Sequence, residues 1–166
     1  MTESSAFDAS RFPGQALLPM EPLWAETFGE RLAGIDPWLR LGYSAVGLAR
    51  YLSARPDDRE VFALFAGEAP AACLTVRPGW LRGPLLELLA VLPEHQGHGL
   101  GQALILWLAD EARRQGQANL WTIGSAFNGA ALAFYRRQGF ADVGALPGLI
   151  RPGETEVLLR LSLETA

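Results

Sequence analysis

The residues best suited to chemistry in this chain are three glycines, Gly97, Gly99 and Gly101, in one short loop. The loop follows an apolar run over 85–92 and precedes helically spaced apolar residues over 100–115, so a strand leads through it into an amphipathic helix. Glycine lacks the Cβ atom that keeps an anion away from the backbone, and the first N–H groups of a helix have no partner within it. The pattern predicts a phosphate or pyrophosphate site, with a plain strand-to-helix turn as the alternative.

Two common phosphate-binding motifs differ from this loop. A dinucleotide site would have glycine at position 102 and an acidic residue at the end of the next strand, but the chain has Gln102 and ends that strand with Ile123-Gly124-Ser125. A nucleoside-triphosphatase loop needs a lysine, and all 14 basic residues of this chain are arginines. The absence of lysine also excludes enzymes that form a Schiff base.

Two blocks of sequence together resemble one protein family. QGHGLGQ (96–102), after the strand end LAVLP, looks like the acetyl-CoA pyrophosphate loop of the GNAT superfamily of N-acetyltransferases. SAFNGAALAFYRRQGF (125–140) is similar to that family's segment with N...A..FY...GF. The blocks stand in the family order, and with their flanking residues they cover 85–142.

The resemblance implies an α/β (α+β) fold with a mixed, mostly antiparallel central sheet and helices on both faces. It implies acetyl-CoA as the cosubstrate, with its pantetheine beside the backbone of Leu89, Ala90 and Val91. It places the pyrophosphate on a cradle made of Gly97, His98, Gly99, Leu100, Gly101 and the amide of Gln102. It also places Asn128 against the cofactor; a helix N-cap is the alternative for this residue, and one side chain can serve both roles.

Acetyl transfer needs a neutral amine and a proton for the departing thiolate. Tyr135 matches the tyrosine of the resembled motif, and its reference pKa of about 10, against about 8.5 for a thiol, keeps it protonated at neutral pH. We therefore expect Tyr135 to be the acid. The alternative is a core aromatic side chain on a helix, with Phe134 beside it.

Glu87 is the candidate base. Strand alternation would place it on one face with Leu85, Leu89 and Val91, where apolar neighbours would raise its pKa toward the useful range. A structurally paired carboxylate and a water chain are the alternatives. Some related ribosomal-protein acetyltransferases carry a glutamate on the following strand, and this chain has Ile123 near that place.

For the acceptor pocket, aromatic and acidic residues that could surround a cationic amine are Asp36, Trp38, Tyr43 and Trp80. His95 and His98 are expected to be solvent-facing, and Cys73 to be a buried thiol. Because Cys73 is not expected to act as a nucleophile, we expect the acetyl group to be transferred directly in a ternary complex. The acceptor is expected to be a primary amine of a small molecule or of a protein N-terminus. The competing hypothesis is a non-catalytic acyl-CoA-binding regulatory module.

The apolar periodicity predicts the elements that must position these residues. Helices are expected over 21–33, 44–54, 100–115 and 130–138, and 36–43 is expected to be a short aromatic loop. Strands are expected over 16–20, 60–66, 71–77, 85–92, 119–123 and 156–163, the consecutive ones over 60–92 being antiparallel. Residues 1–12 are expected to be a disordered tail without the pattern of a signal peptide, and 13–166 a single acetyltransferase domain.

Composition restricts the class of protein further. The chain has 166 residues, a net charge of −4, one cysteine and two histidines, which disfavours a disulfide framework, a metal site and a nucleic-acid partner. The longest apolar run, 103–109, is too short to span a membrane. We expect a cytoplasmic monomer or homodimer.

Overall fold

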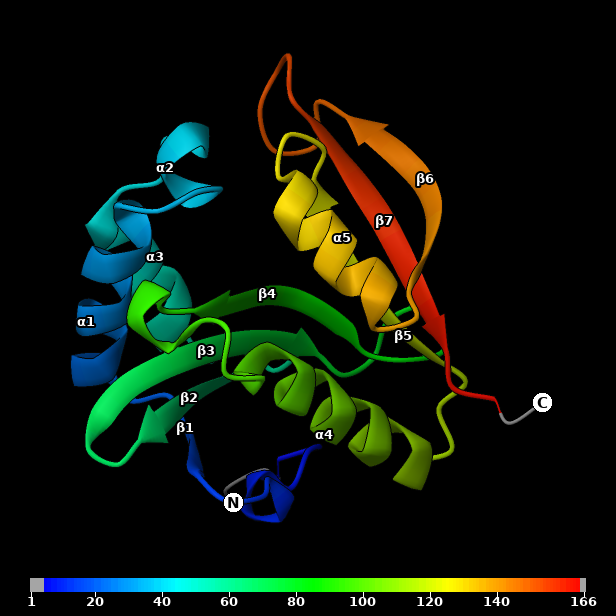
Figure 1. Cartoon of the computed structure of the whole chain (residues 1–166), viewed down its shortest axis with the longest axis horizontal. Coiled ribbons are helices and arrows are strands. Elements are labelled where there is room, and N and C mark those ends of the chain that lie inside the picture. Colours follow the sequence, from blue (N-terminus) through cyan, green and yellow to red (C-terminus); the bar gives the residue numbers. More distant parts are fainter. Residues whose placement is uncertain (1–4, 165–166) are drawn as a thin grey trace.

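The structure, a computed structural model, describes residues 5–164 (Figure 1). Its strands form a seven-stranded sheet in the order β1-β2-β3-β4-β5-β7-β6. The strands are β1 (Ala16–Pro19), β2 (Glu60–Ala66), β3 (Ala69–Arg77), β4 (Leu85–Val91), β5 (Asn119–Ser125), β6 (Ala141–Pro147) and β7 (Thr155–Ser162). The α-helices are α1 (Pro22–Ala33), α2 (Trp38–Leu41), α3 (Ala45–Ser53), α4 (Leu100–Arg114) and α5 (Gly129–Arg137), with 3₁₀ turns η1 (Ala9–Arg11) and η2 (Pro93–His95). None of the helices in this part of the chain has the length and apolarity needed to cross a membrane.

The sheet is antiparallel except where β4 meets β5. These two strands run parallel and pair only at Leu85 with Trp121 and Leu86 with Thr122. Beyond Leu86 they separate, so the backbone of the later residues of β4 is open on the β5 side. The mixed, mostly antiparallel sheet expected from the sequence is confirmed, and the gap within it positions the site.

The helices pack on both faces of the sheet. Buried side chains of α4 and α5, such as Leu108 and Leu132, share one apolar cluster with Leu74 of β3. Buried side chains of α1 and α3, such as Phe28, share a second cluster with Cys73, the neighbour of Leu74. Because successive residues of a strand point to opposite faces, the sheet lies between two helical layers.

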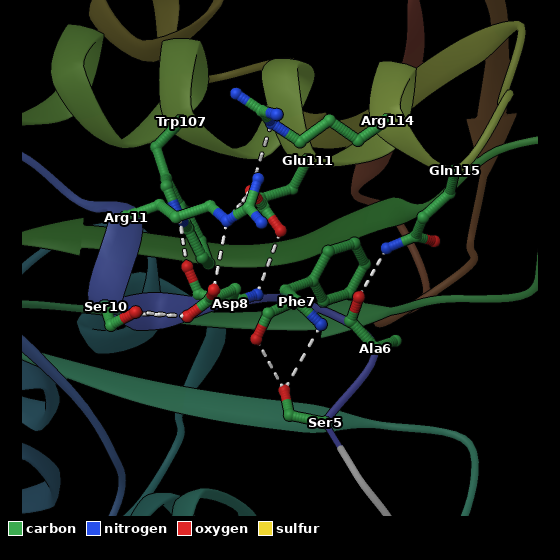
Figure 2. Close-up of polar contacts among 10 residues, drawn as sticks. All are labelled: Ser5, Ala6, Phe7, Asp8, Ser10, Arg11, Trp107, Glu111, Arg114 and Gln115. Carbon is green, nitrogen blue, oxygen red and sulfur yellow. Dashed lines mark hydrogen bonds and ion pairs between the residues drawn. The ribbon is translucent and has the colours of Figure 1, made fainter.

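The segment before β1 packs against α4, where we expected a disordered tail over 1–12 (Figure 2). Phe7 and Phe12 are 1% and 6% exposed, and both rings meet the indole of Trp107 edge-on. Trp107 Nε1 donates to the carbonyl of Asp8 at 3.1 Å, and the Asp8 amide donates to the buried carboxylate of Glu111 at 2.9 Å. The expectation is thus corrected for residues 5–12, because the two phenylalanines fill an apolar space on α4. Residues 1–4 lie outside the described part.

Two further elements differ from the sequence-based expectation. Residues 141–147 form strand β6, which periodicity does not reveal because its side chains are almost all exposed. The expected aromatic loop contains the one-turn helix α2, where the Asp36 carboxylate accepts from the amide of Arg40 at 3.1 Å and the chain turns at Gly42 with a φ of 78°. β6 is the edge strand beyond β7, and α2 lies next to α3 (Figure 1).

Candidate active site

A cleft of about 590 Å³ lies at the carboxyl end of β4, where β4 and β5 separate. Of the residues expected to bind the cofactor, the cleft is lined by Leu89, Ala90, Val91, Gly97, Gly99, Leu100, Gly101, Gln102 and Asn128. The His98 side chain is exposed, its Nδ1 lying 3.3 Å from the carbonyl of His95. The structure therefore brings together all these residues except His98, which was expected in the cradle but does not line the cleft.

The glycine loop is shaped as an open cradle. Gly97 and Gly99 have φ angles of 77° and 79°, in the left-handed region, and a Cβ atom on either would meet nothing within 4 Å. Gln96 holds the loop on the strand, since its side-chain amide donates to the carbonyl of Val91 at 3.0 Å. Among the residues that the structure describes, no side chain caps the N-terminus of α4, so its first amides are available to an anion. These features fit the pyrophosphate of acetyl-CoA.

At position 101, glycine is needed for close packing and not for its backbone conformation. A Cβ atom there would lie 3.0 Å from Cζ of Phe134. The glycine lets the first turn of α4 approach α5, whose residues form the opposite wall of the cleft. Phe134 thus has a packing role beside Tyr135.

Asn128 caps α5, as the alternative proposed from the sequence. Its Oδ1 accepts from the amide of Ala131 at 3.2 Å. Asn128 also lines the cleft, so the cap leaves its amide group at the cofactor side of the helix. In this position Asn128 can cap the helix and contact the cofactor at the same time.

A second cavity, of about 440 Å³, adjoins the cleft. The walls that the two cavities share include Trp38, Leu89, Asn128, Ala131 and Tyr135. An acyl group at the end of the first cavity and an acceptor in the second would therefore meet at these residues. We call the first cavity the cofactor cleft and the second cavity the acceptor pocket.

Tyr135 lies between the two cavities and is 6% exposed. Its ring meets Phe140 edge-on, so it is also part of the core. Burial raises the pKa of Tyr135, and a side-chain hydrogen bond with Thr122 opposes this rise. A phenol in this position is protonated at neutral pH and can donate a proton.

Two of the four residues expected around the acceptor line this pocket, namely Trp38 and Tyr43. Asp36 instead lines the cofactor cleft, where its carboxylate fixes α2. The expectation that Trp80 lines the acceptor pocket is wrong. Its ring meets that of Trp121 edge-on, with 5.3 Å between ring centroids, and Trp80 lines neither cavity. The physical reason is that Trp80 precedes β4, whereas the pocket opens at the other end of that strand.

Glu87 lines the acceptor pocket, but not in the way strand alternation predicts. Thr75 pairs with Leu88 and Val76 with Leu86, so Glu87 is an additional residue in a β-bulge. The bulge breaks the alternation, and Glu87 is directed toward α3, where Tyr51 donates to its Oε2 at 2.8 Å. The expectation that Glu87 lies among apolar side chains with Leu89 and Val91 is therefore wrong.

A second carboxylate lines the pocket, that of Glu156 at the start of β7, which was not among the candidates expected from the sequence. Glu156 is 3% exposed and lies opposite Ser125 of β5, whose Oγ is 3.0 Å from each carboxylate oxygen. Burial raises the pKa of Glu156, and the charge of Glu154 adds to the rise. No sequence signal marks this residue, because it follows a turn that also contains exposed polar residues.

Two segments that line the acceptor pocket, α2 and the loop between β6 and β7, contact each other, and we call them the roof of the pocket. Arg40 of α2 forms an ion pair with Glu154 at 3.3 Å, and its guanidinium lies 4.0 Å from the ring centroid of Phe127. Arg151, in the loop between β6 and β7, donates to the carbonyl of Arg40 at 3.0 Å. These contacts hold α2 and the β6–β7 loop together across the pocket.

The remaining candidates are Cys73 and the two histidines, and none of them lines the acceptor pocket. Cys73 is fully buried in the sheet and lines neither cavity, and burial raises the pKa of its thiol. A thiol that stays protonated is a poor nucleophile. His95 lines the cofactor cleft next to the glycine loop, while His98 is exposed.

Comparison with known proteins agrees with this geometry. The sequence model of the acetyltransferase (GNAT) family matches residues 19–140. The [ribosomal protein bS18]-alanine N-acetyltransferase of Escherichia coli K12 is 32% identical over 113 residues, covering 68% of this chain and 70% of that enzyme. The crystal structure of the E. coli ribosomal-protein-S18-alanine N-acetyltransferase has a TM-score of 0.68 and 26% identity over 92% of this chain and 96% of that one.

A streptothricin acetyltransferase of Streptomyces lavendulae is 38% identical over 89 residues, or 53% of this chain. The match spans 47% of that enzyme's length, so less than half of it is represented. An aminoglycoside 6′-N-acetyltransferase, solved in complex with coenzyme A, shares the fold with a TM-score of 0.69 and 13% identity, over 90% of this chain and 98% of that one. Since the family match covers more than half of the chain and every residue that lines the first cleft, the chain belongs to the GNAT family of acetyltransferases and is an acyltransferase that uses acetyl-CoA.

Proposed function

We propose that this protein transfers the acetyl group of acetyl-CoA directly to a primary amine, with both substrates bound at once. The observation that carries the proposal is the shared wall of the two cavities, at Leu89, Asn128, Ala131 and Tyr135. A covalent acetyl-enzyme would need a nucleophile at this wall, and Cys73 is buried elsewhere. Direct attack requires only that the amine and the thioester meet there.

The residues of the cofactor cleft divide the work of holding acetyl-CoA. The backbone of Leu89, Ala90 and Val91 is open on the side of β5 and would pair with the pantetheine amides. The loop glycines and the first amides of α4 would bind the pyrophosphate. Acetyl-CoA supplies the activated acyl group, and these contacts orient its thioester toward the acceptor pocket.

Tyr135 would supply the proton of the departing thiolate. It stands between the cavities, and its raised pKa keeps the hydroxyl protonated when the thioester bond breaks. Its burial also excludes water from the reacting atoms. Trp38 and Tyr43 would surround the acceptor with aromatic faces suited to a cation.

The names of the relatives point to two kinds of acceptor, a small molecule such as streptothricin or an alanine of a protein such as ribosomal protein bS18. The contacts of Arg40 with Glu154 and Arg151 support the small molecule, because they tie together α2 and the β6–β7 loop, two segments that line the acceptor pocket.

Thermal unfolding with acetyl-CoA, CoA and NAD tests the cofactor. Stabilisation is expected with both CoA compounds, and a response to NAD alone would reject the proposal. Release of free thiol is then measured with nourseothricin, 1,4-diaminobutane, phenethylamine and a peptide that begins with alanine. Higher turnover with the small amines than with the peptide is expected, and the reverse would favour a protein acceptor.

Steady-state kinetics test direct transfer. Varying acetyl-CoA at several amine concentrations should give intersecting double-reciprocal lines, because both substrates must bind before the first product leaves. Parallel lines, together with exchange of label between acetyl-CoA and CoA in the absence of amine, would indicate an acetyl-enzyme instead.

A further inference from the structure

The acceptor pocket has two carboxylates, and their surroundings differ. Glu87 is fully engaged: Arg77 Nε lies 3.2 Å from its Oε1, and the Tyr51 hydroxyl donates to its Oε2 at 2.8 Å. Arg77 is also paired with Asp58, and Tyr51 is hydrogen-bonded to Thr75 at 2.7 Å. This network gives each oxygen of Glu87 a donor and fixes its orientation.

Glu156 is more deeply buried and has far fewer partners. Among residues 5–164 its only side-chain partner is Ser125, whose Oγ lies 3.0 Å from both oxygens, and no ion pair there includes it. A hydroxyl has one proton and can donate to one oxygen, so the other oxygen retains its lone pairs. A buried carboxylate without a cation is costly, which makes it a strong site for a cation that enters the pocket.

The charged and titratable groups around Glu156 come from each neighbouring element. Tyr43, just before α3, lines the same pocket as Glu156 and Glu87, and its pKa is raised by burial and by the charges of these two carboxylates. Glu154 lies on the same turn and is paired with Arg40. β5 contributes Ser125, and the facing residue of β6 is Leu146, an apolar side chain.

We propose that Glu156 is a catalytic residue of the acceptor pocket, where its carboxylate binds the acceptor's ammonium group and removes a proton from it. The proposal rests on the proposed function and adds the base to it. It assigns Glu87 to positioning, because both of its oxygens already hold donors. The acceptor is thus a cationic primary amine that enters beside Glu156 and Ser125.

The proton balance is complete with the groups present. Glu156 takes one proton from the ammonium, and the neutral nitrogen bonds to the carbonyl carbon of acetyl-CoA as the carbon–sulfur bond breaks. Tyr135 gives its proton to the leaving sulfur and regains one from the new amide nitrogen. Glu156 then releases its proton to solvent, so the products are the acetylated amine, CoA and one proton. The raised pKa of Glu156 makes it a stronger base than an exposed glutamate.

The test compares Glu156→Gln with Glu87→Gln in the full chain, using the acceptor that gives the fastest thiol release in the amine panel. Glutamine keeps the size and the contact with Ser125 but cannot take a proton. At neutral pH, Glu156→Gln should lower kcat/KM by about 100-fold or more. Because solvent deprotonates more amine as the pH rises, this defect should shrink about tenfold per pH unit up to the pKa of the amine.

Glu87→Gln is the matched control, since it removes the other carboxylate of the same pocket. Its defect should be the same at every pH, because it changes orientation and not proton removal. Glu156→Asp should recover part of the activity and restore the wild-type pH profile. The affinity for CoA, measured by thermal shift, should match wild type in all three variants.

A pH-independent defect in Glu156→Gln, or wild-type kcat/KM in that variant, would overturn the proposal. So would a pH-dependent defect found only in Glu87→Gln, which would make Glu87 the base. If Glu156→Gln does not fold, the pH profile of Glu156→Asp decides, and an unchanged kcat there would also overturn it. Failure of the proposed function is distinct, because the wild-type protein would then release no thiol with any amine.

Discussion

At the residue scale, Tyr135 combines a core position with access to both cavities. Replacing it with phenylalanine removes one oxygen and keeps the ring that packs on Phe140. We therefore expect Tyr135→Phe to lower kcat by about 100-fold, the usual contribution of a positioned acid, while the Kd for CoA stays within about twofold. The rate of thiol release measures kcat, and a CoA titration measures Kd. Unchanged turnover, with the chemical step limiting, would remove Tyr135 from this role.

Glu156 also predicts how stability depends on pH. Its pKa in the folded protein is raised above the ordinary value of 4.5, so the folded state holds a proton that the unfolded state has already lost. The free energy of unfolding therefore falls as the pH rises from the unfolded pKa through the folded one. Glu156→Gln has no such loss and should be more stable than wild type at neutral pH, although it is less active.

Chemical denaturation of both proteins from about pH 4 to about pH 8 measures this difference. The gap between Glu156→Gln and wild type should be small at the acidic end and should widen as the pH rises. A gap that narrows with rising pH would mean that the folded state stabilises the ionised carboxylate instead. Exposed carboxylates titrate equally in both proteins and cancel in the comparison.

At the scale of elements, α4 begins and ends next to glycines of similar conformation. Gly99 has a φ of 79° and Gly116 a φ of 71°, and a Cβ atom on either would meet nothing within 4 Å. Alanine at either position should cost about 1 kcal/mol of stability, because the left-handed region is unfavourable for residues with a Cβ atom. Gly99→Ala alone should weaken CoA binding, since its methyl group points into the cradle.

Equal losses of CoA affinity in Gly99→Ala and Gly116→Ala would contradict this placement of the cradle. Isothermal titration with CoA and thermal unfolding without ligand separate the two effects. At least a tenfold weaker Kd for Gly99→Ala corresponds to about 1.4 kcal/mol of lost contact with the pyrophosphate.

The contact between α2 and the β6–β7 loop is the second element-scale feature. Arg40→Ala removes the ion pair with Glu154 and the stacking on Phe127. We expect the KM for a small amine to rise severalfold, because the roof of the pocket is no longer held in place, while stability changes by less than about 1 kcal/mol. Arg113→Ala is the control, since it removes an exposed ion pair with Asp110 on α4. Equal KM values in both variants would show that the roof does not shape the pocket.

At the scale of the whole molecule, the N-terminal segment packs against α4, the helix that follows the glycine loop (Figure 2). Phe7 is 1% exposed against Trp107, so Phe7→Ala should lower the free energy of unfolding by about 3–5 kcal/mol. Leu23→Ala, at a position that is 70% exposed, should change it by less than about 0.5 kcal/mol. Urea unfolding measures both, and equal midpoints would show that the segment does not contribute to the core.

Much of the fold could be predicted because apolar periodicity is a local property. The helix over 100–115 and the strands over 60–66 and 85–92 follow from side chains that must all face one layer or fill the sheet. β6 could not be found in this way, since an exposed edge strand is held by its backbone pairing with β7 and carries no apolar alternation. The segment over 5–12 was missed because two phenylalanines separated by polar residues resemble a tail until α4 is beside them.

The sequence by itself determined the family and predicted the glycine cradle and the tyrosine, because these lie in contiguous segments where residue type and spacing carry the chemistry. Only the tertiary structure decided which carboxylates face the acceptor. A bulge that depends on the pairing of β3 with β4 directs Glu87 to Arg77 and Tyr51, and the register of β7 on β5 brings Glu156 to Ser125. Both outcomes depend on contacts between residues far apart in the chain, which no local pattern of side chains records.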